Sequence, residues 1–321
     1  MKQRLFDYIT QHSWYKNLIH TLKNIRFSSK DDLSLYRIIH VFIEKISRDE
    51  IIERANAVAF NFTVAIFPGI IFLFTLIPYI HQVIPEVSQE NIMEFISNFM
   101  TPDMYGTVYL TIEDIVGNTR GGLLTFGALF SLYLATNGML SLMRAFNACY
   151  STIEKRGFFK MRLVATMLTI MFAVILITAT LLVVGGNILL NNVQSVEWIN
   201  FENYNFALIF ILRFIIIFSF FFFGISFVYY FGPSVHYNWR FFSVGSFIAT
   251  LLCIGAVYVF TFYLENFATY NKLYGSLGVL IALMLFIEIL SIIVLVGYEI
   301  NASIHKAHSM TGDQLPLEYE D

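Results

Sequence analysis

Polar side chains interrupt the long apolar stretches of this chain, and they are the groups that could carry chemistry there. The candidate polar positions are Asn61, Asn137, Arg144, Asn147, Arg213, Glu288, Glu299 and Asn301. A charge or an amide among apolar side chains is costly unless it is paired, hydrogen-bonded or hydrated. These positions therefore predict polar contacts between packed helices, or a site or path for a proton, a cation or a polar head group.

Arg144 and Glu299 are the most specific pair in this set. Both lie near the end of an apolar stretch, on the side where most of the positive charge gathers, so their depths should match. This predicts an ion pair that joins the second stretch to the sixth. The alternative is that each side chain extends separately into lipid head groups. Asn137, Ser141, Arg144 and Asn147 are spaced so that they share one stripe of a helix.

Glu288 lies near the middle of the sixth stretch, on the same helical face as Glu299, because eleven residues make about three turns. Arg213 is the base embedded in another stretch, but at a different depth, so a pair between Arg213 and Glu288 would be strained. A carboxyl group in this position is either a proton or cation site or a buried acid satisfied by hydrogen bonds. The residues alone leave both interpretations open.

Proline and small residues predict how the helices bend and meet. Pro68 lies seven residues after Asn61 on the same face and removes a backbone donor, which predicts a kink in the first stretch. The kink either lets helices cross or forms a hinge beside a cavity. In the fifth stretch, Gly245, Ala249 and Cys253 recur at steps of four, a pattern typical of close helix contact.

The elements that must position these groups are six stretches long enough to cross a bilayer as helices. They are expected near 57–81, 121–144, 162–186, 207–231, 241–264 and 276–300. With 57% hydrophobic residues, 34 Phe and only 13% charged residues, the composition excludes an ordinary soluble domain. Lipid cannot satisfy the backbone of an open strand, so the predicted fold class is all-α, a polytopic membrane helical bundle.

The lysines and arginines gather on one side of the predicted bundle. The first 54 residues hold ten of the 20, and the link after the second stretch holds four more beside Arg144. Arg120 and Lys272 are the two expected on the opposite side. Loops rich in Lys and Arg stay in the cytoplasm, so both termini are predicted to be cytoplasmic.

The remaining segments divide the chain further. Residues 1–34 form a basic tail without a cleavable signal sequence, and 306–321 form a polar tail. Residues 35–54 are expected to form a helix that lies on the membrane surface, or alternatively one packed beneath the bundle. The loop 82–120 carries two short amphipathic patterns, which predict extracytoplasmic helices that cap the outer face. The membrane domain as a whole is expected over 35–305.

Several kinds of chemistry are not expected. The seven histidines are scattered and the two cysteines lie near or inside stretches, so neither a metal site nor a disulfide framework is indicated. No nucleophile–base pair for catalysis can be identified. We therefore expect no enzyme activity, no cofactor and no specific binding of nucleic acid. The oligomeric state cannot be predicted.

Three sequence motifs are shared with a known family. The strongest is the run Tyr270–Gly278, with Tyr270, Asn271, Lys272, Tyr274, Gly275, Ser276 and Gly278 as its polar and glycine positions. The others are Arg144-x-x-Asn147-x-x-Tyr150 and Gly297-x-Glu299-x-Asn301, and Pro233 and Gly245 also fall at family positions. Over roughly 40–305 the chain resembles the YihY / virulence factor BrkB family, formerly labelled ribonuclease BN. It departs from the family pattern at Ala65 and at Glu288.

The resemblance implies a six-span protein of the bacterial cytoplasmic (inner) membrane, which agrees with the charge count. Charges held inside a membrane usually mark a path or a wet pocket. We therefore interpret the chain as a transporter or flippase-like protein for a lipid or another amphiphile, with the lipid bilayer as its surroundings. The alternative is a scaffold that supports envelope integrity without moving anything. Ribonuclease activity is not expected, although the old family label suggests it.

Overall fold

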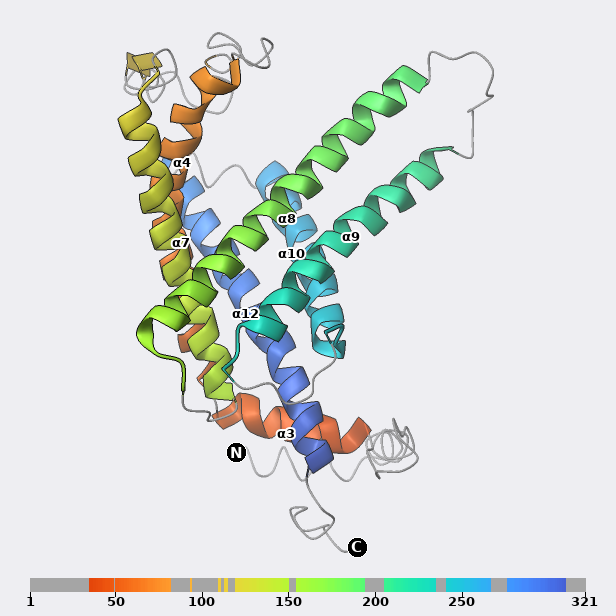
Figure 1. Cartoon of the computed structure of the whole chain (residues 1–321). Helices are drawn as coiled ribbons and strands as arrows, with labels where there is room; N and C mark the ends of the chain where they lie inside the picture. Colours follow the sequence, from red (N-terminus) through yellow and green to blue (C-terminus); the bar gives the residue numbers. More distant parts are fainter. Residues whose placement is uncertain are drawn as a thin grey trace, which may run out of the picture.

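The structure is a computed structural model, and all the regular elements in its described part are α-helices (Figure 1). It describes residues 35–48, 50–81, 93, 109–110, 113–114, 119–149, 154–193, 205–234, 241–266 and 276–309. The helices are α3 (Leu35–Arg48), α4 (Ile51–His81), α7 (Gly121–Cys149), α8 (Phe158–Val193), α9 (Asn205–Phe231), α10 (Val244–Asn266) and α12 (Ser276–Ser309). Among the described residues, six helices are long and apolar enough to cross a membrane. The predicted all-α, six-span fold is confirmed.

The predicted stretches lie inside these six helices, with one shift at the start of α10. That helix was expected from residue 241 but begins at Val244. Ser243 and Ser246 explain the later start, because the Ser243 Oγ atom accepts a hydrogen bond from the Ser246 backbone N–H at 3.2 Å. The Ser246 Oγ atom accepts one in return from the Ser243 N–H at 3.1 Å. This reciprocal cap satisfies two backbone donors that a helix start leaves unpaired.

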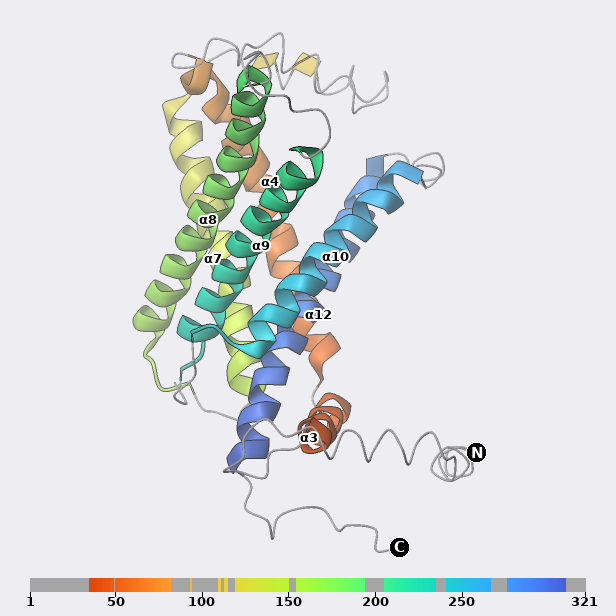
Figure 2. The same ribbon diagram turned by 90° about the vertical axis from the view of Figure 1, so that its right-hand side faces the viewer.

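The expected helix 35–54 is two elements. The first, α3, ends at Arg48, and α4 begins at Ile51 with a first-turn bond from the Arg54 N–H to the carbonyl of Glu50. α3 lies crosswise beneath the ends of the long helices (Figures 1 and 2). This agrees with the alternative of a helix packed beneath the bundle. The side of α3 that packs against α12 includes Ile38 and Val41.

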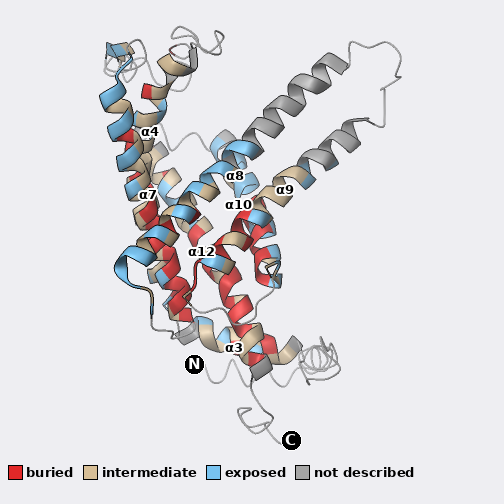
Figure 3. Ribbon diagram, in the orientation of Figure 1, coloured by how far each residue is buried: buried red, intermediate tan, exposed pale blue. Residues whose placement is uncertain are grey.

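The three helix pairs α4–α7, α8–α9 and α10–α12 converge near α3 and diverge away from it. Figure 1 shows α4 and α7 parting from α8 and α9, and Figure 2 shows α10 and α12 leaning away from the rest. The buried residues gather at the α3 end (Figure 3). There Phe146 of α7 stacks on Tyr298 of α12 with ring centroids 4.1 Å apart, and Tyr229 of α9 packs edge-on against both rings. The core therefore joins three helices at one end of the bundle.

α10 and α12 make the closest backbone approach. A methyl group added to Gly245 would overlap the carbonyl oxygen of Gly297, and one added to Gly297 would lie 2.6 Å from the Ala249 methyl group. Ala249 and Cys253 are buried on the same stripe of α10. The close helix contact predicted from this small-residue pattern is therefore found.

Candidate functional site

Glu299 is fully buried and forms an ion pair with Lys45 of α3. Its Oε1 atom accepts a hydrogen bond from Lys45 Nζ at 2.6 Å, and the same ammonium group donates to the Cys149 carbonyl at 2.8 Å. The exposed fraction of the side chain is 0% for Glu299 and 12% for Lys45. The last carbonyls of a helix lack intrahelical partners, so the end of α7 is a suitable acceptor for this cation. One lysine therefore joins α3, α7 and α12.

The predicted Arg144–Glu299 ion pair is wrong. Arg144 is exposed on α7, although Met143 and Ala145 on either side of it in sequence are buried. The prediction considered only groups inside the six stretches and did not consider a cation from α3. Because α3 runs beneath the bundle, Lys45 reaches the carboxylate from outside the six spans.

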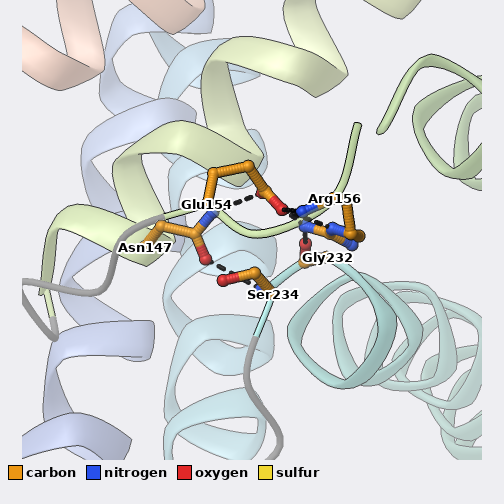
Figure 4. A network of polar contacts seen from close by, with 5 residues as sticks. All are labelled: Asn147, Glu154, Arg156, Gly232 and Ser234. Atoms are coloured by element: carbon orange, nitrogen blue, oxygen red, sulfur yellow. Dashed lines mark hydrogen bonds and ion pairs between the residues drawn. The ribbon is translucent and has the colours of Figure 1, made fainter. Parts of the chain in front are cut away.

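Asn147 is the centre of a second polar network, drawn in Figure 4. Its Nδ2 atom donates to Glu154 Oε2 at 2.8 Å, and its Oδ1 atom accepts from the backbone N–H of Ser234 at 2.8 Å. Arg156 donates from Nε and Nη2 to the two Glu154 oxygens, each at 2.8 Å. Arg156 Nη2 also donates to the carbonyl of Gly232 at 2.8 Å. The network ties the link between α7 and α8 to the end of α9.

The charges in this network stabilise one another. The hydrogen bonds from Arg156 are the main reason that the pKa of Glu154 lies below its ordinary value of 4.5, and Asn147 lowers it further. A guanidinium fork on a carboxylate is the stronger kind of surface ion pair, because two parallel bonds fix its geometry. Asn147 thus has a structural role, because it connects the link between α7 and α8 to the end of α9.

Asn301 holds the start of α10 against α12. Its Oδ1 atom accepts from the Gly245 N–H at 2.8 Å, and its Nδ2 atom donates to the Ser243 hydroxyl oxygen at 2.8 Å. The Gly245 N–H is one of the donors left unpaired at a helix start, so the asparagine completes the cap from a neighbouring helix. Of the motif positions, Gly297 and Asn301 thus both contact α10, and Glu299 contacts α3.

The predicted stripe on α7 is divided among different neighbours. Ser141 accepts a hydrogen bond from Asn61 Nδ2 of α4 at 2.9 Å. Asn137 accepts one from Arg162 Nη1 of α8, whose Nη2 atom donates to the Tyr133 carbonyl at 3.0 Å. The guanidinium carbon of Arg162 also lies 4.2 Å from the centre of the Tyr133 ring. Asn137, Ser141 and Asn147 therefore link α7 to different neighbours, Arg144 is exposed, and the four residues do not line a common site.

Glu288 lies apart from these contacts, at a groove between α4 and α12. With the Asn56 amide turned so that its nitrogen meets acceptors, Nδ2 donates to Glu288 Oε1 at 3.0 Å and to the Ile52 carbonyl at 3.2 Å. The groove has a volume of about 310 Å³. Its lining is Asn56, Ala59, Phe60, Thr63, Ile281, Met284, Leu285 and Glu288. The side chain of Arg213, the base considered earlier for Glu288, is outside the described part of the chain.

Of the remaining predicted positions, some lie in the described part of the chain and others do not. Pro68 is buried, and α4 continues through it from Ile51 to His81, so the first span is not a broken helix. The motif residues Tyr270–Gly275 and most of the predicted outer loop 82–120 lie outside the described residues. Ser276 begins α12, and Gly278 is buried. A role for the motif loop stays a prediction.

Five residues that take part in these contacts were not candidates from sequence: Lys45, Asn56, Glu154, Arg156 and Arg162. Lys45 carried a usable signal, because it follows the buried Ile38 and Val41 at helical spacing and therefore shares their face. Glu154 and Arg156 lie in a link, where no periodicity indicates which side chains meet.

Comparison with known proteins agrees with the motifs. The family described as virulence factor BrkB matches residues 42–319. A ribonuclease-like protein of Bacillus subtilis (strain 168), YfkH, is 28% identical over 268 residues, which cover 79% of this chain and 90% of that protein. No solved structure matches the chain.

Proposed function

The chain belongs to the virulence factor BrkB family, and we propose that this multi-pass membrane protein is a transporter or flippase-like protein for a lipid or another amphiphile. The observation that supports it best is the asymmetry of the bundle. Its helices converge on a buried, polar-bonded end beneath which α3 lies, and they diverge toward the other end (Figures 1 and 3). Transporters that alternate between two openings need one end closed while the other is open.

The closed end is held by side-chain hydrogen bonds and an ion pair, and such contacts can break and form again with other partners. Lys45, Asn147 and Asn301 each bond across elements through side chains, and the buried second oxygen of Glu299 has no hydrogen-bond partner among the described residues. A buried carboxylate oxygen without a partner is costly, and we infer that a change of state at this end would relieve that cost. This supports a gate made by α3, α7 and α12.

An amphiphile is favoured over a small polar solute because the groove at Glu288 is lined mainly by apolar side chains. Phe60 and Leu285, which line it, are exposed on the apolar surface of spans. A lipid could enter such a groove from the side without crossing the packed end. We further propose that both termini are cytoplasmic and that the membrane is the bacterial inner membrane, as the charge distribution predicts.

The test is translocation in proteoliposomes that contain a phospholipid with a fluorescent tail. A membrane-impermeant quencher removes the signal of the outer leaflet, and a protein that moves lipid lets it remove the inner-leaflet signal as well. We expect this extra loss, and we expect Glu299→Gln to change the rate per molecule at equal protein content. If wild-type vesicles behave like protein-free vesicles for each head group tried, and Glu299→Gln alters only abundance, the scaffold alternative replaces the proposal.

The name of the Bacillus subtilis relative includes ribonuclease-like, and a nuclease is the competing class. Metal-dependent nucleases cluster carboxylates and imidazoles around one or two ions. In the described part of the chain, no group of three or more His, Cys, Asp or Glu side chains could hold a metal ion. The expectation that the protein is not an enzyme stays a prediction, and incubation of the purified protein with RNA would test the nuclease alternative directly.

A further inference from the structure

We propose that the groove between α4 and α12 binds the cationic ammonium end of an amphiphile at Glu288, with the apolar tail along the groove wall. This names a substrate class for the proposed transport and so rests on it in part. Binding and movement are separate measurements, however, and either can fail alone.

The charge of Glu288 is the first step of the argument. Asn56 is the hydrogen-bond donor that reaches its carboxyl group, and no Lys, Arg or His of the described residues lies within ion-pair distance of it. This differs from Glu299, which has Lys45, and from Glu154, which has Arg156. A carboxylate in a membrane span is costly without a cation, so a ligand that brings one would bind with a charge-assisted hydrogen bond.

The shape and lining of the groove are the second step. Phe60, Met284 and Leu285 line it and are themselves 63%, 41% and 54% exposed, so the groove opens on the surface of the span. In a membrane this surface faces lipid tails. The polar members of the lining are Asn56, Thr63 and Glu288. An apolar wall with one acid and two neutral polar groups is complementary to an alkyl chain that ends in an amine.

The position of Glu288 is the third step. It lies eleven residues, about 16 Å of helix, from Glu299 at the closed end. An ammonium group held at Glu288 would therefore lie beside Asn56, which follows the first residue of α4 by five positions, and about 16 Å of α12 away from Glu299. A lipid bound in this way has already brought its polar end into the membrane, which is the costly part of crossing it.

The experiment uses full-length protein in nanodiscs of phosphatidylcholine and three photoreactive probes. They share one alkyl tail with a photoreactive group and end in a primary amine, an alcohol or a carboxylic acid. Labelled peptides are identified by mass spectrometry. We expect the amine probe to label 56–63 or 281–288 about tenfold more than the alcohol, and the acid probe to label them least. Equal labelling by the amine and the alcohol overturns the proposal.

Two variants and one control test whether the preference for the amine probe depends on Glu288 and on the groove. Glu288→Gln should bring amine labelling down to the level of the alcohol, while Leu285→Trp should reduce labelling by both probes because it fills the groove. Glu53→Gln removes one negative charge from an exposed position of the same α4 helix and should change nothing. Amine preference that persists in Glu288→Gln also overturns the proposal. If the amine binds as expected and no lipid moves in proteoliposomes, the site stands and the transport function fails.

Discussion

Lys45 Nζ lies 2.6 Å from Glu299 Oε1, a contact between residues 254 positions apart in the sequence. It places the crosswise helix α3 under the closed end of the bundle and neutralises a carboxylate that is fully buried. Because both groups are removed from water, their interaction is screened little by salt. The pair thus connects α3 to the spans through a buried charge, and its loss should destabilise that end of the bundle.

Lys45→Met should lower the stability of the protein by about 3 kcal/mol, because it leaves the Glu299 charge buried without a partner. The measurement is the midpoint of thermal aggregation of detergent-purified protein. The double variant Lys45→Met with Glu299→Leu should recover part of the loss, since no charge then remains buried. Lys160→Met and Arg144→Met, which remove exposed cations, are the controls and should behave like wild type. A single variant as stable as these controls would contradict the role given to the pair.

Gly245→Ala should prevent or severely reduce folding. The added methyl group would overlap the carbonyl oxygen of Gly297 and the amide of Asn301, and helix backbones cannot move apart without breaking the cap at Gly245. Gly255→Ala is a matched control in the same helix, because nothing lies within 4 Å of its added methyl group. It should be neutral or stabilising by up to about 1 kcal/mol.

Expression level and monodispersity on size exclusion distinguish the two alanine variants. We expect little or no monodisperse protein for Gly245→Ala and wild-type behaviour for Gly255→Ala. If the two profiles are alike, α10 and α12 do not pack as closely as the structure shows.

The fold could be predicted from sequence because bilayer thickness fixes the length of each span and lipid excludes other backbone structures. Composition and runs of apolar residues were therefore sufficient for six helices. The start of α10 could not be placed, because the mutual cap of Ser243 and Ser246 decides it and no periodicity marks such a cap. The division of 35–54 into α3 and α4 was also missed. The chain leaves the helix at Glu50, where neither proline nor glycine marks the break in the sequence.

From the sequence, the site could be predicted only as a set of polar residues within apolar stretches, without their partners. Glu299, Asn147, Asn301 and Asn61 do make interhelical or interloop contacts, as the cost of polar groups in lipid requires. Their partners could not be predicted, because pairing depends on the rotation of each helix and on elements outside the spans. Arg144 shows the difficulty: it was expected at the depth of Glu299, but its side chain is exposed and does not reach that carboxylate.

Acid should weaken the link between α7 and α8 through Glu154. Its folded-state pKa is lowered, mainly by Arg156, so the stabilising effect is fully present above the ordinary value of 4.5 and is lost as pH falls through the lowered pKa. In the variant Glu154→Gln this contribution is absent at every pH. The difference in melting temperature between wild type and the variant should therefore be largest near neutral pH and shrink below pH 4.5.

Glu53→Gln provides the control, as a change of the same chemistry at an exposed position outside this network. The difference in melting temperature between wild type and Glu53→Gln should not show the pH dependence expected for Glu154→Gln. A Glu154→Gln difference that grows in acid would reverse the sign of the linkage and contradict the role of Arg156.

The orientation of the protein can be tested with its own buried cysteines removed. Cys149 and Cys253 are both free and buried, so a background with Cys149→Ala and Cys253→Ala leaves no native thiol. Lys155→Cys then reports on the link between α7 and α8, and Arg120→Cys reports on the opposite ends of the spans, because one precedes α7 and the other follows it. Both native side chains are exposed, so the new thiols should react freely wherever the reagent is present.

The distribution of Lys and Arg predicts that Lys155 faces the cytoplasm and Arg120 the outside. In intact cells a membrane-impermeant maleimide should therefore label Arg120→Cys, while Lys155→Cys should react only after the membrane is permeabilised. The reverse pattern would place the α3 end outside the cell and would turn the proposed gate to the other face of the membrane. Because labelling depends on access and not on transport, this result stands whether or not the protein moves a lipid.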